Sequence, residues 1–127
     1  MVIVIVVAVA AVSVYFLTSK GPTSTTTLGI SCLDSEPIRC AHAYLQGANL
    51  AALELVGANF TGANLKNVDF TQADLENATF RNANLANTNF SQADLTGANL
   101  NGTNFNEAIF CDTIMPDGSP NSVDCSQ

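Results

Sequence analysis

Four cysteines are the residues of this chain best suited to covalent chemistry, and they lie in two pairs, Cys32 with Cys40 and Cys111 with Cys125. Neither spacing matches the Cys-x-x-Cys pattern of a zinc site. Four cysteines allow three disulfide pairings, of which we expect the two local ones, because each closes a short loop. Disulfides form in oxidising compartments such as a periplasm or an organelle lumen. Four free thiols in a reducing cytosol are the alternative.

Other residues that could do chemistry are few. His42 is the only histidine, so no pair of histidines can bind a metal, and no Gly-rich loop follows a strand to hold a phosphate. Asp112, Asp117 and Asp124 could hold a calcium ion, but they lack the spacing and the terminal glutamate of an EF-hand loop. The sequence therefore predicts a protein that is not an enzyme and has no metal, no cofactor and no small-molecule substrate.

Acidic side chains dominate the charge of the chain. The formal net charge is -7 at pH 7, with 11 Asp and Glu against 4 Lys and Arg. After Lys20 the basic residues are Arg39, Lys66 and Arg81. Because proteins that bind nucleic acid present a basic patch or stripe, we expect no nucleic-acid partner.

The first 19 residues form the longest apolar run. Residues 1–17 carry no charged side chain, and Lys20 is the first one. As a helix rising 1.5 Å per residue, 17 to 19 residues would span roughly 26 to 29 Å, close to the hydrocarbon thickness of a bilayer. We therefore predict one transmembrane α-helix over 1–19. A cleaved signal peptide is the alternative, although no basic residue precedes the run and Ala8-Val9-Ala10 lies inside it.

Residues 20–42 are expected to form a flexible tether, rich in Gly, Ser and Thr, and then an N-terminal cap.

Two indicators of membrane topology disagree. Lys20 directly after the apolar run would be cytoplasmic by the positive-inside rule, whereas the cysteines favour an oxidising side. One lysine is the weaker indicator, so we predict a single-pass membrane protein whose C-terminal domain lies in the periplasm or the thylakoid lumen.

Between residues 43 and 111 the chain repeats every five residues. The fourteen consecutive units follow a pattern of small, polar and then Leu or Phe, as in ANFTG, ANLKN and ADLEN. The central position is Leu or Phe without exception. We expect the central side chains to form the core: Leu45, Leu50, Leu55, Phe60, Leu65, Phe70, Leu75, Phe80, Leu85, Phe90, Leu95, Leu100, Phe105 and Phe110.

A period of five residues decides the geometry. On an α-helix each unit would rotate the apolar pair by roughly 140°, so no stripe would form along the helix. In a straight strand an odd period would send the pair to opposite faces in successive units. The chain must therefore turn a corner in every unit. All central side chains then point into a closed coil, and coils stack through parallel ladders about 4.8 Å apart.

Tandem units of the A(D/N)LxG type resemble the pentapeptide-repeat family, in particular its membrane-anchored or exported members of the cyanobacterial and lumenal type. The resemblance covers more than half of the chain. It implies an all-β solenoid, a right-handed quadrilateral parallel β-helix with four units per coil and about 3.5 coils over 43–111. The Phe spacing alone fits coils of twenty residues or of ten. Some bacterial members carry similar tails with MPDG after the last coil, which supports a disulfide-closed cap over 112–127.

Four units per coil would stack Glu54, Asp74 and Asp94 at the same position of successive coils, with Glu76 beside them. Carboxylates about 4.8 Å apart repel by about 1 kcal/mol even in water, and a protein partner or a cation would relieve this repulsion. These four residues are the candidate docking face. A solvated acidic face is the simpler alternative.

Anchor, tether and rigid solenoid together predict a non-enzymatic structural or docking subunit of a membrane complex. The resemblance to lumenal members suggests a photosynthetic complex, with the solenoid as a scaffold for protein-protein interaction. Two alternatives remain. Acidic members of the family that mimic DNA inhibit a gyrase-type topoisomerase, which the net charge fits but the anchor and the cysteines do not. A soluble lumenal protein would result if the N-terminal segment were cleaved as a signal.

Overall fold

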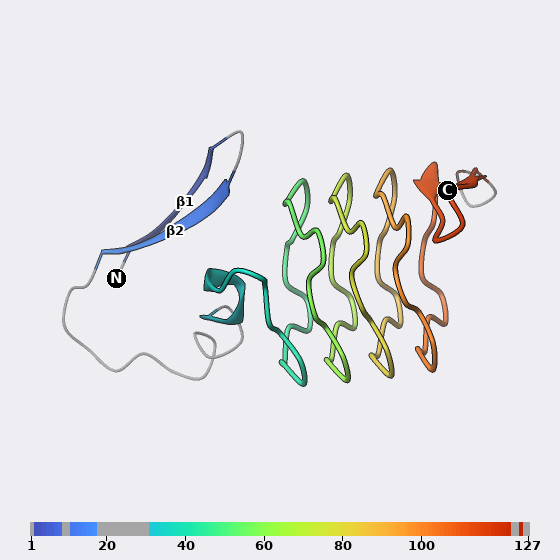
Figure 1. Ribbon diagram of the computed structural model, residues 1–127, viewed down its shortest axis with the longest axis horizontal. Helices are drawn as coiled ribbons and strands as arrows, with labels where there is room; N and C mark the ends of the chain where they lie inside the picture. The colour runs from blue at the N-terminus through green and yellow to red at the C-terminus, as the bar shows by residue number, and fades with distance from the viewer. Residues whose placement is uncertain (1, 9–10, 18–30, 123–124, 126–127) are drawn as a thin grey trace.

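The computed structural model describes residues 2–8, 11–17, 31–122 and 125 of the chain (Figure 1). Its regular elements follow in the order β1 (Val2–Ala8), β2 (Ala11–Leu17), the 3-10 helix η1 (Ser31–Asp34), β3 (Thr113–Ile114) and β4 (Pro120–Asn121). Between η1 and β3 the chain winds as a coil whose turns are joined by single parallel bridges.

Each bridge joins residues that are twenty positions apart, such as Asn64 and Asn84 or Asp74 and Asp94. The bridges form four columns: Arg39 to Asn99, Tyr44 to Asn104, Asn49 to Ile109, and Glu54 to Ile114. One coil therefore contains twenty residues and has four sides. The spacing of ten residues is excluded, and the fold is the quadrilateral parallel β-helix.

The bridge columns begin earlier and end later than the array expected over 43–111. The first rung is at Arg39 and the last at Ile114, so each column has four rungs, and the coil is longer than about 3.5 turns. Cys40 fills the first central position and is fully buried, and Thr113 is buried where other units place Ala. The sequence pattern missed these units because it required Leu or Phe at the centre, whereas a buried Cys packs as a small apolar residue.

Every corner of the coil requires a left-handed backbone. The residue two positions after each central residue, from His42 to Asp112, has a φ between 51° and 72°. A positive φ at this position is the signature of a type II turn. The turn is closed by bonds such as the one from the Ala73 amide to the Phe70 carbonyl, 2.9 Å. Most corners carry Gly, Asn or Gln, and Gly and Asn in particular adopt this conformation at low cost.

Where Asn or Asp stands before a central position, its side chain braces the next corner. The amide of Thr71 donates to Asp69 Oδ1 at 2.9 Å, and that of Ser91 donates to Asn89 Oδ1 at 3.0 Å. This is the Asx turn that Asn and Asp form with the amide two residues on. The A(N/D)L pattern therefore encodes one apolar wall residue, one brace and one core residue per unit.

Aromatic rings stack through the interior of the coil. Phe60 lies on Phe80 with ring centroids 5.3 Å apart, and Phe70 lies on Phe90 at 5.2 Å. Rings from neighbouring sides meet edge to face, as in the pair Phe70 and Phe80 at 5.9 Å. All predicted core residues from Leu45 to Leu95 are buried. A buried hydroxyl, that of Thr88, is satisfied because it donates to the Leu65 carbonyl at 2.9 Å.

The core prediction is wrong at the last coil. Phe105 is 50% exposed, and Leu100 and Phe110 are only partly buried. They directly follow Asn99, Asn104 and Ile109, which are the last rungs of their bridge columns in the part of the chain that the structure describes. Their sequence units look like those of the interior, but burial in a solenoid depends on the next coil.

The N-terminal segment also differs from the expected transmembrane helix over 1–19. β1 and β2 pair as an antiparallel hairpin, from Val2 opposite Leu17 to Ala8 opposite Ala11. Seven Val and two Ile lie within residues 2–17, and β-branched residues favour strands over helices. Among the described residues, no helix combines the length and the apolar character that a bilayer crossing needs. The expected tether lies mostly outside the described residues.

Two matched substitutions test the interior assignment. We expect Phe80→Ala to lower the free energy of unfolding by about 3–5 kcal/mol, because it empties a closed site against Phe60. Phe105→Ala should cost less than about 1.5 kcal/mol, because that ring is half exposed. Urea denaturation of both variants, followed by circular dichroism, measures the difference; equal losses would contradict the assignment.

Candidate functional site

The structure places the predicted docking residues together. Glu54, Asp74 and Asp94 occupy successive rungs of one bridge column, which continues to Ile114. Glu76 follows Asp74 by two residues and lies at the same corner. Glu54 is exposed and the other three are partly buried. One side of the solenoid therefore carries a short line of carboxylates.

Two of these carboxylates have a local structural task. Asp74 Oδ1 accepts the amide of Glu76 at 3.1 Å. Asp94 Oδ1 accepts both the amide of Thr96 at 2.8 Å and its hydroxyl at 2.6 Å. At other corners Asn supplies the same acceptor, as Asn84 does for the amide of Ala86 at 3.2 Å. The position needs a side-chain oxygen, and it does not need a negative charge.

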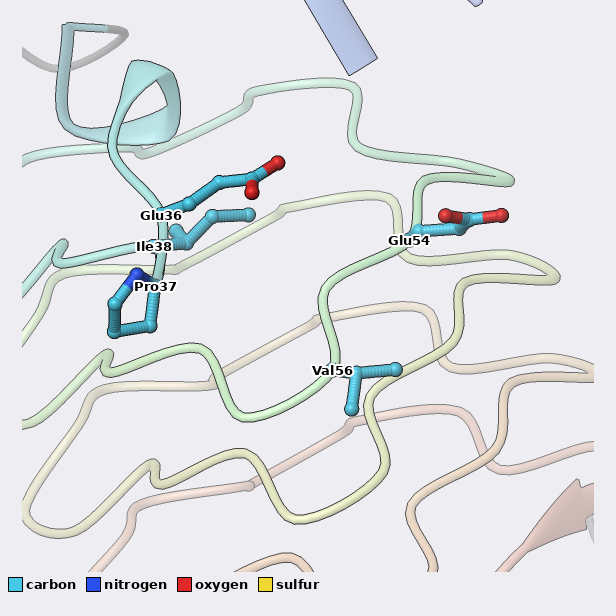
Figure 2. Close-up of a pocket in the computed structure, with 5 residues that line it drawn as sticks. All are labelled: Glu36, Pro37, Ile38, Glu54 and Val56. Atoms are coloured by element: carbon cyan, nitrogen blue, oxygen red, sulfur yellow. The ribbon is translucent and has the colours of Figure 1, made fainter. Parts of the chain in front are cut away.

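Glu54 belongs as well to a shallow, open pocket beside the first coil (Figure 2). The other lining residues are Glu36, Pro37, Ile38 and Val56. The lining therefore combines two carboxylates with three apolar side chains. Val56 is 52% exposed at its edge.

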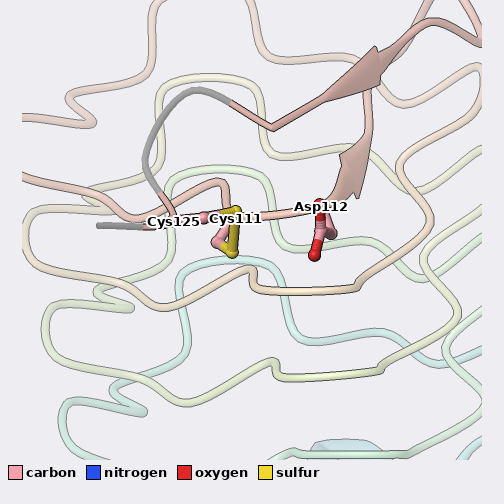
Figure 3. A group of neighbouring side chains, drawn as sticks. All are labelled: Cys111, Asp112 and Cys125. Carbon is pink, nitrogen blue, oxygen red and sulfur yellow. A yellow bond between two sulfur atoms is a disulfide. The ribbon is translucent and has the colours of Figure 1, made fainter. Parts of the chain in front are cut away.

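Disulfides close both ends of the solenoid. Cys32 pairs with Cys40, with Cα atoms 5.0 Å apart, and Cys111 pairs with Cys125 at 4.7 Å. The first bond ties η1 to the buried start of the coil. The second ties the tail to the last coil (Figure 3). The solenoid therefore has one disulfide at each of its two ends.

Asp112 lies near the second disulfide, and its carboxylate and the two sulfurs of Cys111 and Cys125 fall within 4.8 Å of one another (Figure 3). Metals bind the thiolate form of cysteine, and the bonded sulfurs are not thiolates. One carboxylate alone then remains. The group has no metal-binding capacity while the disulfide is closed.

Asp112 and Asp117, two of the carboxylates considered for a calcium loop, lie in different surroundings. Hydrogen bonds from the Ser119 hydroxyl and then the Ser119 amide hold the pKa of Asp117 below its usual value. The Ser119 amide nitrogen lies 2.9 Å from Asp117 Oδ1. Asp117 braces the turn before β4, whereas Asp112 lies beside the disulfide, and Asp124 lies outside the described residues.

His42 has a structural position at the first corner of the coil. Its φ is 59°, and its ring covers Gly62 of the next coil. A Cβ added at Gly62 would come within 2.6 Å of His42 Nδ1. A side chain at Gly62 would displace the imidazole, and His42 itself is exposed at the corner.

Exposed apolar side chains are the surface feature that the sequence pattern did not single out. Tyr44 is 71% exposed in the first coil, and Phe105 is 50% exposed in the last. Tyr44 was detectable, because it occupies a brace position that Asn fills in the three coils after it. Phe105 was not, because its unit is regular.

The hydrogen bonds that Asp74 and Asp94 accept at their corners can be tested by substitution. Asp74→Asn keeps the side-chain oxygen and removes one charge, so we expect stability to change by less than about 0.5 kcal/mol. Asp74→Ala removes the acceptor of the Glu76 amide and should cost about 1 kcal/mol. Urea denaturation of both variants decides; an Asn variant as unstable as the Ala variant would show that the charge itself is needed.

The second disulfide gives another prediction. Closing the segment from Cys111 to Cys125, with a sequence separation of 14, should stabilise the chain by about 3 kcal/mol. Cys111→Ser with Cys125→Ser should therefore lower the melting temperature. A melt of this variant that coincides with the wild type under oxidising conditions would refute the staple.

The sequence model of the pentapeptide repeats (8 copies) matches residues 38–77 and 73–112. No curated protein matches the chain. Solved structures of pentapeptide repeat proteins are also similar to it.

The protein from the cyanobacterium Cyanothece 51142 is 35% identical over 57% of this chain and 46% of that chain, with a TM-score of 0.40. The protein from the Arabidopsis thaliana thylakoid lumen is 29% identical over 65% of each chain, with a TM-score of 0.44. A Nostoc protein is 25% identical over 84% of this chain and 93% of that chain, with a TM-score of 0.42. The matched part spans less than two thirds of the first two. On the match over residues 38–112, this chain belongs to the pentapeptide-repeat family.

Proposed function

We propose that this chain is a non-enzymatic docking subunit of a membrane complex, with its solenoid exposed on the periplasmic or lumenal side. The observation that carries the proposal is the filled interior of the coil. Every central side chain from Leu45 to Leu95 is buried, so the coil has no room for a substrate. What remains for function is a rigid outer surface and two ends.

The cysteines support the oxidising location. Both disulfides are closed, and the chain has no free cysteine among the described residues. Structural disulfides persist in secreted, periplasmic and lumenal proteins and are rare in a reducing cytosol. A rigid platform stapled at both ends suits such a compartment.

The apolar run supports attachment to a membrane. In a bilayer, the outer edges of a two-stranded hairpin would leave amides and carbonyls without partners, which costs several kcal/mol for each group. A helix satisfies all of its central backbone groups internally. We therefore propose that residues 1–19 are helical when inserted in lipid and serve as the anchor of the solenoid.

Chemical cross-linking of the full chain in its native membranes tests the docking role. After mild detergent extraction and native electrophoresis, we expect the chain to migrate with a larger complex and to cross-link to a membrane protein through its solenoid. A chain that migrates free of partners would contradict the proposal.

Two further readouts on the same sample test the location and the anchor. Maleimide-PEG should label no thiol before reduction, because both disulfides are formed in the cell. Intact mass should include residues 1–19. Four labelled thiols would place the domain in the cytosol, and a mass lacking the apolar run would identify a soluble lumenal protein.

A further inference from the structure

The last coil of the solenoid ends in free backbone groups. Within the stack, each central amide donates to the coil that follows, as Leu85 does to the Asn104 carbonyl at 2.7 Å. In the last coil, the equivalent amides of Leu100, Phe105 and Phe110 have no acceptor among the residues that the structure describes. This end is therefore an open sheet edge, ready to pair with another backbone.

One of the four sides of this edge is covered. β3 lies in the column of Glu54 and Asp94, and β4 pairs with it, with Ile114 opposite Pro120. Proline has no amide donor, so β4 closes this side without presenting a new row of donors. Figure 1 shows β3 and β4 at one corner of the last coil. The described residues leave the other three sides uncovered.

An apolar side chain lies beside the open edge. Phe105 is 50% exposed, and its ring contacts that of Phe110 edge to face with centroids 6.3 Å apart. Leu100 is partly buried on the neighbouring side. Backbone donors and an exposed aromatic ring therefore occur together, which is the combination that binds an extended strand in β-augmentation.

The charge around this end is negative. After Arg81 the sequence has no Lys, Arg or His, while Glu107 and Asp112 are exposed at corners of the last coil. Asp117 is exposed in the turn before β4, where hydrogen bonds from Ser119 lower the pKa of its carboxyl. A second copy of this end would bring like charges together, whereas a cationic segment is complementary.

We infer that the open end of the last coil docks an extended, basic and apolar segment of a partner protein. The segment adds a strand along the side formed by residues 103–105, where the Phe105 amide and the Thr103 carbonyl have no partner among the described residues. It lays a hydrophobic side chain on the Phe105 ring. This inference rests on the proposed docking function and names the chemistry of its partner. It moves the contact from the acidic column of Glu54, Asp74 and Asp94 to the end of the solenoid.

A synthetic peptide with the sequence KLKFKLK is the probe. Added to the full, isotope-labelled chain in lipid nanodiscs, it should shift the amide resonances of Leu100, Phe105 and Glu107 in NMR spectra. A peptide of the same sequence with alternate backbone amides methylated should bind at least tenfold more weakly, because the strand pairing is lost. Equal binding of the two peptides would overturn the inference.

Variants that keep the fold separate the contributions. Glu107→Gln with Asp112→Asn removes two charges, and Gln and Asn already stand at equivalent corners such as Gln92 and Asn87. We expect this variant to bind the probe about three- to tenfold more weakly at low salt. Phe105→Ala should weaken binding further, whereas Tyr44→Ala, at the far end of the coil, should leave it unchanged.

Three outcomes would overturn the inference: resonance shifts centred on Asp74 and Asp94, binding unaffected by the variants at the open end, or a dimer of the chain formed through Phe105. Its failure is distinguishable from that of the proposed function. A chain cross-linked into a complex through other coils would retain the function and lose the inference. A chain that binds the probe at Phe105 but has no partner in membranes would keep the binding site at the open end and contradict the proposed function.

Discussion

The rest of the structure depends on one constraint, the left-handed backbone conformation of every fifth residue from His42 to Asp112. Because the same turn recurs after each central residue, the chain bends the same way four times and arrives above itself twenty residues later. Amides then meet carbonyls of the next coil, as Leu75 meets Asp94 at 2.8 Å. The phenylalanine stacks, the buried alanine walls and the braces of Asn and Asp follow from that return. None of them could form if the corners opened.

A repeat this regular leaves its outer surface and its two ends exposed. The interior is filled by side chains that touch only their neighbours in the stack, so stability is distributed along the coil as in other solenoids. Departures from the pattern gather at the two ends. Cys40 and the first disulfide close one end, Tyr44 is exposed beside it, and Phe105 is exposed at the other. The ends are where this chain differs from an endless coil.

The sequence predicts the interior well, because strand alternation and an odd period leave a closed coil as the only arrangement for Leu75 and its equivalents. It does not predict the number of sides, since the Phe spacing is compatible with ten or twenty residues, and only the backbone bridges decide. The burial of Phe105 was overestimated, because burial depends on a following coil that no residue in its own unit encodes. The N-terminal run is ambiguous for another reason: a short apolar segment rich in β-branched residues has no periodicity that separates helix from strand.

Residue-resolved hydrogen exchange of the full chain tests the central claim most directly. In the inner coils, four amides of each unit donate to backbone carbonyls, as Asp74 does to Leu53 at 3.0 Å and Asn77 to Thr96 at 2.8 Å. The fifth, such as Glu76, donates only to a side-chain oxygen. We expect slow exchange at four positions and fast exchange at the fifth, repeated every five residues from 59 to 98. Uniform protection without this period, or none at all, would contradict it.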